Sequence, residues 1–490
     1  MTLDRDATAQ AFTDPTSLNR PLCVDLDGTL VLTDTLWESV VLLMRQRPWL
    51  TLLLPLWLLR GRAHFKESVR NHVSLDVAVL PYRESLLVAL RAAKGAGRKL
   101  VLATAADSQV AARVAAHVGL FDLVFASEQG KNLKAGHKEA RLAAEFGAQG
   151  FDYVGDSHAD LKVFRAAQQG YLIGGTEALG RRVQGGNVRV LSPRPSVLRA
   201  VFKQLRPHQW AKNALVVLPA LLAPKFSVDN FVAGLTGAAA FSLCASAGYV
   251  LNDLLDLEAD RAHRTKRNRP LASGALPVAW GPPLFIALAA GSVALGALLS
   301  SVSFLLLLGV YFVATLSYSF YLKKRTLLDV LVLAWLYTHR IIAGGAATSV
   351  PLSAWLLAFS MFIFLSLAFV KRYVELSALT DDRAIKHRDY MRSDIPMVAS
   401  MGTASGYLAV LVFSLYVDQG AREAAYAEPL FLWLSVPVLL YWISRIWILA
   451  GRGQLEDDPV KFALRDKVSL TCGVVLVLLR VLARYGQLNF

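Results

Sequence analysis

The chain has 490 residues, more than one compact core usually holds, and a formal net charge of +15. Apolar residues make up 54% of the chain and charged residues only 18%, a composition typical of a membrane protein. Excess Lys and Arg in such a protein usually mark loops that face anionic lipid, so we expect no nucleic-acid partner. Residues 1–200 have the charge density of a soluble domain, whereas 210–490 consist of apolar runs between short charged loops.

The beginning of the chain predicts that the first domain stays in the cytoplasm. Its sequence, MTLDRDATAQAFTDP, is polar and acidic and has no apolar signal-peptide core. We expect residues 1–19 to be disordered or loosely ordered. The cysteines, Cys23, Cys244 and Cys472, lie far apart in apolar surroundings, which fits a reducing compartment.

Short apolar segments that end in polar residues predict buried strands in the first domain: 21–33, 99–107, 121–127 and 150–161. Helical stretches lie between them at 108–120 and 137–147. Strands that alternate with helices predict a parallel sheet with its site at the carboxyl ends of the strands. The segment VRVL predicts a last edge strand, and we expect a linker at 191–207.

The residues at these strand ends resemble the motifs of the haloacid-dehalogenase (HAD) phosphohydrolase superfamily over about 20–175. The sequence DLDGT begins at Asp25, Thr104 follows the second strand, and GDSHAD places Asp156 and Asp160 after the fourth. Two lysines, Lys134 and Lys138, fit the remaining motif, with Lys138 preferred. The resemblance implies a Rossmann-like α/β domain over 20–190, with a small helical cap at about 36–95.

The same resemblance implies the chemistry of the site. Asp25 would attack the phosphoryl group and carry it as an aspartyl-phosphate. Asp27 would protonate the leaving oxygen and later activate water. Asp25, Asp156 and Asp160 would hold Mg²⁺, and Thr104 and the lysine would steady the transferring group. The alternative is a degenerate domain that serves as a scaffold.

The cap contains a very apolar segment, WLTLLLPLWLL at 49–59. It is too short to span a bilayer, and Pro55 interrupts it. One interpretation is a buried cap helix. The other is a helix that lies on the membrane surface and docks this domain near a lipid-borne phosphate. Basic residues flank the segment: Arg45, Arg47, Arg60 and Arg62.

The second half predicts an all-α polytopic membrane domain over 208–490 with about nine helices. The apolar runs are 210–224, 230–251, 278–299, 302–321, 328–347, 352–370, 396–416, 428–449 and 467–485. With the first domain in the cytoplasm, the loops on its side carry five, three, six and three Lys or Arg, whereas the opposite loops carry one, none, none and one. This asymmetry predicts a multi-pass protein of a bacterial-type inner membrane with both sites cytoplasmic.

The stretch from Asn252 to Gly274 carries Asp253, Asp256 and Asp260 at spacing i, i+3, i+7, which predicts one face of a helix. Grouped carboxylates suit Mg²⁺, which often shares its ligands with substrate phosphates. The alternative is an ordinary charged loop between two helices. A cationic cluster follows, which suits the remaining phosphate charge: Arg261, Arg264, Lys266, Arg267 and Arg269.

Nine helices with NDxxDxxxD after the second resemble the UbiA superfamily of intramembrane prenyltransferases over about 200–490. Lys266 and Arg269 match the basic stretch after that motif. The second acidic motif of the superfamily is expected in 371–394, but no clean DxxxD stands there. This loop begins instead with Lys371, Arg372 and Glu375, and its aspartates are Asp381, Asp382, Asp389 and Asp394.

The segments KRYVEL (371–376) and LRPHQWAKN (205–213) are more similar to the polyprenyl-phosphate phosphoribosyltransferase branch. That branch moves phosphoribose from phosphoribosyl diphosphate (PRPP) to a lipid phosphate. The resemblance implies that Mg²⁺ on the three aspartates neutralises the diphosphate, while cations clamp phosphates. A bland interpretation of both segments is interfacial anchoring by snorkelling cations. The implied substrate-binding residues are Asn252, Lys266, Arg269, Lys371, Arg372, Glu375, Lys212, Tyr318 and Lys323.

The fusion predicts a bifunctional cell-envelope enzyme with Mg²⁺ at both sites, in which the first domain dephosphorylates the lipid-linked product. The expected partners are polyprenyl phosphate, PRPP and membrane lipids. A homo-oligomer does not follow from the sequence. One alternative is an aromatic-acceptor prenyltransferase that uses a polyprenyl diphosphate. Another is a non-catalytic protein that binds polyprenyl lipids.

Overall fold

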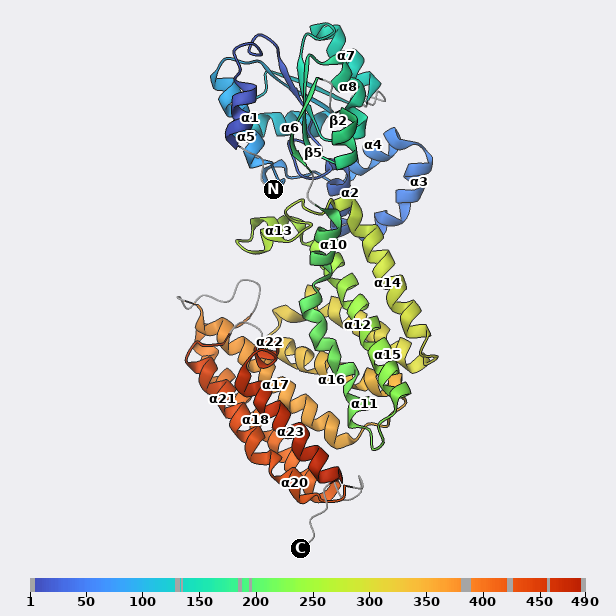
Figure 1. Ribbon diagram of the computed structural model, residues 1–490, viewed down its shortest axis with the longest axis vertical. Coiled ribbons are helices and arrows are strands. Elements are labelled where there is room, and N and C mark those ends of the chain that lie inside the picture. The colour runs from blue at the N-terminus through green and yellow to red at the C-terminus, as the bar shows by residue number, and fades with distance from the viewer. Residues whose placement is uncertain are drawn as a thin grey trace. The chain divides into compact units, whose positions relative to one another are not determined.

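The computed structural model describes residues 5–127, 133, 135–183, 187–193, 196–379, 389–420, 426–455 and 459–485. The chain divides into two compact units, which are described separately below (Figure 1). The first unit consists of Met1–Leu205 and Tyr249–Phe285. The second consists of Arg206–Gly248 and Ile286–Phe490. The first unit therefore includes the Asp-rich stretch as well as the N-terminal domain.

A six-stranded sheet of described residues forms the centre of the first unit, in the order β3-β2-β1-β4-β5-β6. Every pairing in it is parallel, and β6 lies at the edge, as the sequence predicts. The sequence interpretation missed β5, whose apolar run is only three residues long between glycines. The strands are β1 Leu22–Val24, β2 Leu100–Asp107, β3 Leu123–Ser127, β4 Asp152–Gly155, β5 Gln169–Gly175 and β6 Val188–Pro193.

Alternate residues of the strands face two hydrophobic cores. Leu22 and Val24 belong to one core, and Cys23 belongs to the other, because successive side chains of a strand point to opposite faces. Helices from both sides complete these cores (Figure 1). The first core uses α5 (Glu84–Gly95) and α6 (Ser108–Val118), and the second uses α7 (Gly136–Phe146), α8 (Leu161–Ala166) and α9 (Glu177–Val183).

The expectation of a disordered N-terminal segment is wrong for residues 5–19, which the structure describes. Helix α1, Arg5–Phe12, packs on the sheet domain. Phe12 is fully buried and meets the ring of Tyr171 edge-on, with the ring centroids 5.0 Å apart. The polar composition of this segment did not indicate a helix. A few buried residues are nevertheless enough to hold a short amphipathic helix in place.

The cap contains α2 (Thr35–Gln46), η1 (Pro48–Leu53), α3 (Leu54–Leu59) and α4 (Arg62–His72). Asp34 caps α2, since its side chain accepts hydrogen bonds from the backbone N–H groups of Leu36 and Trp37. These helices enclose a small core of their own around Leu43, Trp57 and Val69. Helix α5 instead packs into the main core, so the separate cap core ends with α4.

Residues Tyr249–Phe285 belong to the first unit and contain the end of α12 (Val228–Leu255), α13 (Leu257–Ala262), η5 (Lys266–Asn268), η6 (Val278–Trp280) and the start of α14 (Gly281–Ala297). Gly274, at φ +73°, passes so close to the N-terminal domain that an added Cβ would lie 2.4 Å from the carbonyl oxygen of Leu32. Only glycine fits this approach.

The described residues contain eight helical segments that are long and apolar enough to cross a membrane. They match eight of the nine expected runs. Run 210–224 forms the short elements η4 (Pro207–Val216) and α11 (Leu218–Leu222) instead. The eight segments are Val228–Leu255, Val278–Ala297, Val302–Phe320, Leu328–Thr348, Ala354–Ser377, Arg392–Gln419, Leu430–Gly451 and Lys467–Tyr485.

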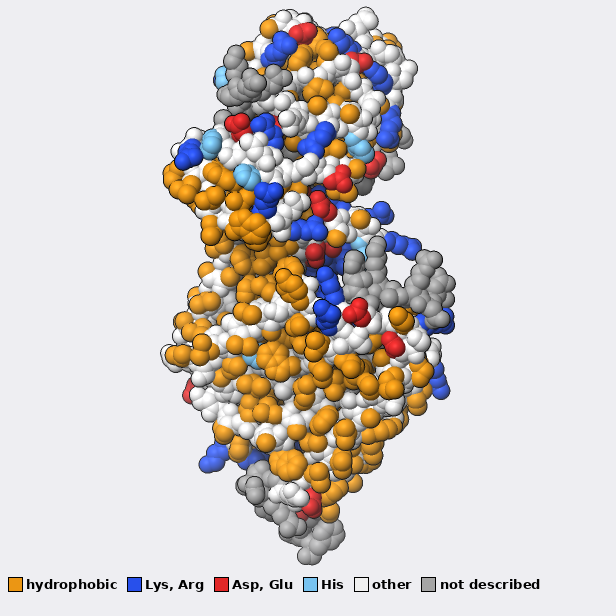
Figure 2. All heavy atoms as spheres, turned by 180° about the vertical axis from the view of Figure 1, so that it is seen from behind, with side chains coloured by type: hydrophobic (Ala, Val, Ile, Leu, Met, Phe, Trp, Pro, Cys, Tyr) orange, Lys and Arg blue, Asp and Glu red, His pale blue; other side chains and the backbone are white. Residues whose placement is uncertain are grey.

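Small residues let two of these helices pack closely within the second unit. On α18 (Ile395–Leu415), a Cβ added to Gly402 would lie 2.7 Å from Cβ of Phe369, which belongs to α17 (Ala354–Ser377). Ser366 Oγ also donates a hydrogen bond to the Gly402 carbonyl at 2.6 Å. Close backbone approach of this kind is typical of membrane helices. Hydrophobic side chains cover much of the outer surface of these helices (Figure 2). Together with their lengths, this surface makes the protein a multi-pass membrane protein.

Candidate active sites

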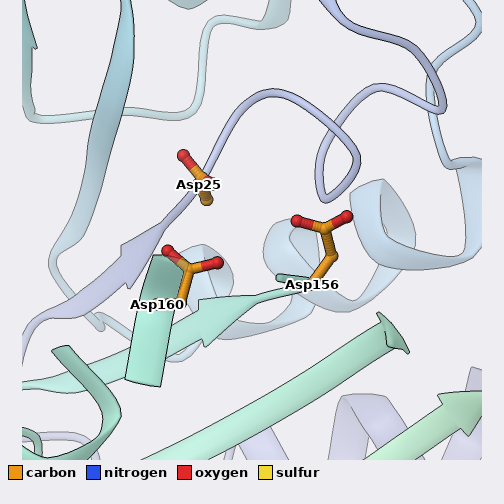
Figure 3. A group of neighbouring side chains, drawn as sticks. All are labelled: Asp25, Asp156 and Asp160. Carbon is orange, nitrogen blue, oxygen red and sulfur yellow. The ribbon is translucent and has the colours of Figure 1, made fainter. Parts of the chain in front are cut away.

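Three carboxylates converge at the carboxyl ends of β1 and β4. Asp25 follows β1, Asp156 follows β4, and Asp160 lies in the short helix η3 (His158–Asp160). Figure 3 shows their side chains around one common space. One oxygen of each lies within 4.8 Å of the others. The parallel sheet therefore brings together the three residues that the sequence singled out as metal ligands.

Lys138 is the lysine of the described chain that reaches this cluster. Its Nζ donates hydrogen bonds to Asp25 Oδ1 at 2.9 Å and to the Tyr153 hydroxyl at 2.8 Å, and it lies 3.4 Å from Asp160 Oδ1. Lys134, the other candidate, lies outside the described residues. The Tyr153 hydroxyl in turn donates to Asp160 Oδ1 at 2.7 Å. Sequence reasoning missed Tyr153, although it stands only two residues before the GD motif.

The electrostatics of the cluster fit a divalent cation. Burial raises the pKa of Asp25 to about 6, even though the Lys138 ammonium acts in the opposite direction. The Lys138 ammonium pairs with Asp25 and Asp160, and these three side chains are buried. An all-oxygen donor set of three carboxylates suits Mg²⁺. We conclude that the residues present are able to hold the ion, with Asp25, Asp156 and Asp160 as its ligands.

Asp27 lies beside this cluster in a position suited to an acid. Its Oδ1 accepts a hydrogen bond from the backbone N–H of Thr35 at 2.9 Å. Burial, and next the nearby carboxylate of Asp34, raise the pKa of Asp27 to about 8. Asp27 therefore keeps its proton near neutral pH, which is the form that a general acid needs. The turn between Asp25 and Asp27 leads into Gly28, at φ +78°, where an added Cβ would lie 2.1 Å from Asp156 Oδ2.

The cluster opens into a cavity of about 810 Å³. Thr104, from β2, lies in its wall and is completely buried. The cap contributes the cations Lys66 and Arg70. It also contributes an apolar wall, made by Leu36, Trp37, Val40, Leu58, Phe65 and Val69. The lining of this cavity therefore combines the carboxylate cluster and two cations with an apolar wall.

The Asp-rich stretch is organised around Arg269. Its Nη1 donates to Asp253 Oδ1 at 2.9 Å and to Asp260 Oδ2 at 2.6 Å. Burial raises the pKa of Asp260, and Arg269 partly offsets this effect. The sequence predicts that these aspartates share one face of a helix, and Asp253 and Asp260 do contact the same guanidinium nitrogen. The helix itself is divided at Asp256, where φ is −101° and ψ is 13°. The backbone N–H of Asp260 still donates to the Asp256 carbonyl at 2.8 Å, so the chain continues through a compact turn.

The remaining predicted residues of this stretch are more accessible. Asn252 and Asp256 are half-buried, and Lys266 is exposed. Sequence reasoning missed Gln204, which lies in the last turn of α10 (Val197–Leu205). Its fully buried side chain donates from Nε2 to Asp253 Oδ2 at 2.8 Å. The available signal was its place directly before the LRPHQWAKN segment.

Side-chain contacts tie the Asp-rich stretch to the cap within the first unit. Arg261 Nη2 donates to Glu38 Oε1 at 2.6 Å, and both side chains are buried. Glu38 also accepts a hydrogen bond from Thr33 Oγ1 at 2.6 Å. Arg45 and Glu258 form a second, more exposed pair at 2.9 Å. No sequence signal predicted these pairs, because 223 positions separate Glu38 from Arg261.

The other predicted phosphate-binding residues lie in the second unit. Lys212 and Lys371 line a small cavity together with Tyr337. Arg372 is completely buried, lies 2.7 Å from Asp329 and also pairs with Glu375, so its guanidinium is neutralised by protein groups. Tyr318 on α15 (Val302–Phe320) and Lys323 in η7 (Leu322–Lys324) are half-buried. Asp381 and Asp382 lie outside the described residues.

These features define a class: a parallel α/β domain, with an acidic cluster at its strand ends, joined to a polytopic helical membrane domain. The profile of the UbiA prenyltransferase family matches residues 214–468. The chain therefore belongs to the UbiA family of intramembrane transferases.

Relatives with known sequences resemble either the whole chain or one part of it. Protein y4nM of Sinorhizobium fredii is 38% identical over 473 residues, covering 94% of this chain and 91% of the relative. Decaprenyl-phosphate phosphoribosyltransferase of Mycobacterium tuberculosis is 32% identical over 285 residues, covering 57% of this chain and 92% of that protein. A solved HAD family hydrolase from Salmonella enterica is 18% identical, covers 34% of this chain and 66% of that one, and has a TM-score of 0.27.

Proposed function

We propose that the membrane domain transfers 5-phosphoribose from PRPP to a polyprenyl phosphate, and that the HAD-like domain then removes the 5-phosphate from the lipid-linked product. The observation that carries the first half is the 32% identity to a decaprenyl-phosphate phosphoribosyltransferase over 92% of that protein's length. The second half rests on the assembled carboxylates, lysine and acid at the strand ends. Both sites would face the cytoplasm.

In the transferase reaction, an oxygen of the lipid phosphate attacks C1 of the ribose, and the bond from C1 to the diphosphate breaks. The diphosphate leaves with the bonding electrons, so no covalent intermediate with the protein is needed. Bound Mg²⁺ would neutralise charge on this leaving group, and Asp253, Asp256 and Asp260 are the residues that would hold it. Arg269 and Lys266 would bind phosphate oxygens.

In the phosphatase reaction, the carboxylate of Asp25 attacks the phosphorus of the 5-phosphate. The ribose oxygen leaves with the proton of Asp27, whose pKa is raised to about 8, so that it is mostly protonated at neutral pH. Asp27, now ionised, takes a proton from the water that hydrolyses the aspartyl-phosphate. Lys138, held 2.9 Å from Asp25 Oδ1, stabilises the negative charge of the transferring group. The products are inorganic phosphate and a lipid-linked ribose.

Donor choice is the most direct test of the transferase assignment. The purified full-length protein in nanodiscs receives Mg²⁺ and either ribose-labelled PRPP with polyprenyl phosphate, or a labelled prenyl diphosphate with hydroxybenzoate. We expect label in the lipid fraction from PRPP, no prenylated aromatic acid, and loss of the product in Asp253→Asn. Prenylation of the aromatic acid without incorporation from PRPP would instead establish the aromatic prenyltransferase.

Thermal protection separates catalysis from simple lipid binding. With Mg²⁺ present, PRPP is expected to raise the unfolding temperature of the wild type but not of Asp253→Asn. A protein that only binds polyprenyl lipids would be stabilised by polyprenyl phosphate alone, and PRPP would change neither variant.

A further inference from the structure

The cap exposes an apolar face along its two shortest helical elements. In η1 and α3, Leu59 is 84% exposed, Leu52 is 79% exposed and Trp49 is 65% exposed, and more than half of Leu56 is accessible as well. The spacing of these residues (49, 52, 56 and 59) puts them on one side of a helical path. Hydrophobic side chains gather on this part of the surface (Figure 2). Exposed clusters of large apolar residues usually mark an interaction site.

The opposite side of the same segment already satisfies the packing needs of the cap. Trp57 is buried in the cap core and stacks on His72, with ring centroids 5.3 Å apart. Leu50 and Leu54 pack against the same core. Pro55 lies in the first turn of α3, where a helix needs no N–H from it. The segment is therefore a stable part of the cap, and its outer leucines are not required to fold it.

Basic residues stand at both ends of this face. Arg47 precedes η1 and Arg60 follows α3, and both are exposed. A tryptophan and leucines between exposed arginines match the headgroup region of an anionic bilayer, where apolar groups insert and guanidinium groups meet lipid phosphates. The eight candidate membrane segments of the same chain tether the cap to a bilayer, which raises the effective concentration of that surface.

We propose that the face made by Trp49, Leu52, Leu56 and Leu59 docks the cap on the surface of an anionic lipid bilayer. Pro48–Leu59 spans about 20 Å even if fully helical, less than the roughly 30 Å of a hydrocarbon core, so it lies in the interface and does not cross it. The surface helix is thus favoured over the buried cap helix, because the residues that define the run are exposed.

The docking face is continuous with the wall of the active-site cavity. Leu58, on the same helix α3, lines that cavity together with Phe65 and Val69. A lipid whose chain stays in the bilayer would then present its headgroup at the cavity mouth next to α3. This extension rests on the proposed phosphatase function, whereas the docking itself does not depend on the phosphate that the site hydrolyses.

Spin labels measure the docking directly. All three native cysteines are buried, so Leu56→Cys and Leu59→Cys are labelled separately in the full-length protein, reconstituted in nanodiscs with 30% phosphatidylglycerol. Arg91→Cys, an exposed site on α5, is the matched control. We expect the labels at 56 and 59 to be at least threefold more accessible to oxygen than to a water-soluble nickel reagent, and the control to show the reverse.

Two outcomes would overturn the proposal. In one, the labels at 56 and 59 have the aqueous accessibility of the control in nanodiscs. In the other, spin–spin broadening shows that a second copy of the chain covers the face. Adding Arg47→Gln/Arg60→Gln to the labelled proteins is expected to lower the oxygen preference in anionic nanodiscs. Replacing phosphatidylglycerol by phosphatidylcholine is expected to lower it where the arginines are present and to change little in the double variant. Because no substrate is present, a failure of docking is distinct from a failure of phosphatase activity, which is assayed separately.

Discussion

The first unit carries two sets of three aspartates that are built in different ways. Asp25, Asp156 and Asp160 follow strand ends, and their oxygens lie within 4.8 Å of one another. Asp253 and Asp260 come from a helix end and a short following helix, and Arg269 bridges them. The sheet fixes its carboxylates before any ligand arrives. The helix end holds its carboxylates through a cation, which must exchange partners when a metal–diphosphate binds.

This difference predicts that the two sites fail in different ways. A change in the sheet site removes a group that is already in place, so the chemical step suffers most. A change in the Asp-rich stretch alters both the binding of the diphosphate and the ion pair that organises the turn. The predictions below separate these effects, from the largest to the smallest.

Asp25→Asn is expected to reduce hydrolysis of the 5-phosphate by about a thousandfold or more, because no nucleophile remains. Release of phosphate from the lipid-linked product measures the effect. Transfer from PRPP should stay within about twofold of the wild type, which serves as the internal control. Retention of phosphatase activity would assign the nucleophile to another residue.

Asp253→Asn is expected to reduce transfer from PRPP by about 10²–10³-fold, because the leaving diphosphate loses much of its charge neutralisation. The effect should appear in both kcat and KM, since Arg269 and Gln204 lose a partner in the same change. Initial rates over a range of PRPP concentrations separate the two. Hydrolysis at the Asp25 site is the control, and a parallel loss there would indicate general unfolding.

Asp27→Asn is expected to slow hydrolysis by about a hundredfold when the leaving group is a sugar hydroxyl, which needs a proton. With 4-nitrophenyl phosphate the loss should be much smaller, because nitrophenolate leaves without protonation. Comparing kcat for the two substrates checks the role. An equal loss with both would contradict general acid catalysis by this residue.

Glu38→Gln is expected to destabilise the first unit by about 3 kcal/mol, because it leaves the buried guanidinium of Arg261 without its carboxylate. Urea-dependent proteolysis of the full-length protein in nanodiscs measures the change. Arg45→Gln is the matched control, since its pair with Glu258 is largely exposed and is worth about 0–1 kcal/mol. Equal changes in the free energy of unfolding for the two variants would mean that the buried pair stabilises the protein no more than the exposed pair.

The sequence predicted those features that depend on local pattern. Apolar segments that end in polar residues predicted β1, β2, β3 and β4. Because these strands are parallel, their carboxyl ends lie at one edge of the sheet, and Asp25 and Asp156 meet there. Long apolar runs predicted about nine membrane helices, and eight candidate spans are found among the described residues. In contrast, α1 and β5 depend on a few buried residues in polar or glycine-rich surroundings, which give little local signal.

Contacts between distant segments were not predictable from one sequence. The hydrogen bond from Gln204 to Asp253 and the pair of Glu38 with Arg261 depend on how separate segments fold together. Likewise, the resemblance of the KRYVEL segment implied that Arg372 binds phosphate, although the structure gives it two carboxylate partners. Its role in substrate binding stays a prediction, as do those of Lys212, Lys371 and Glu375.

The central claim is that one chain makes a phosphoribosylated lipid and then dephosphorylates it. PRPP labelled with ¹⁴C in the ribose and ³²P on the 5-phosphate tests this claim in one reaction with polyprenyl phosphate and Mg²⁺. The wild type should yield a lipid that carries ¹⁴C and has released its ³²P as inorganic phosphate, whereas Asp25→Asn should yield a lipid that retains both labels. The same ratio of ³²P to ¹⁴C in the lipid from both proteins would contradict the account.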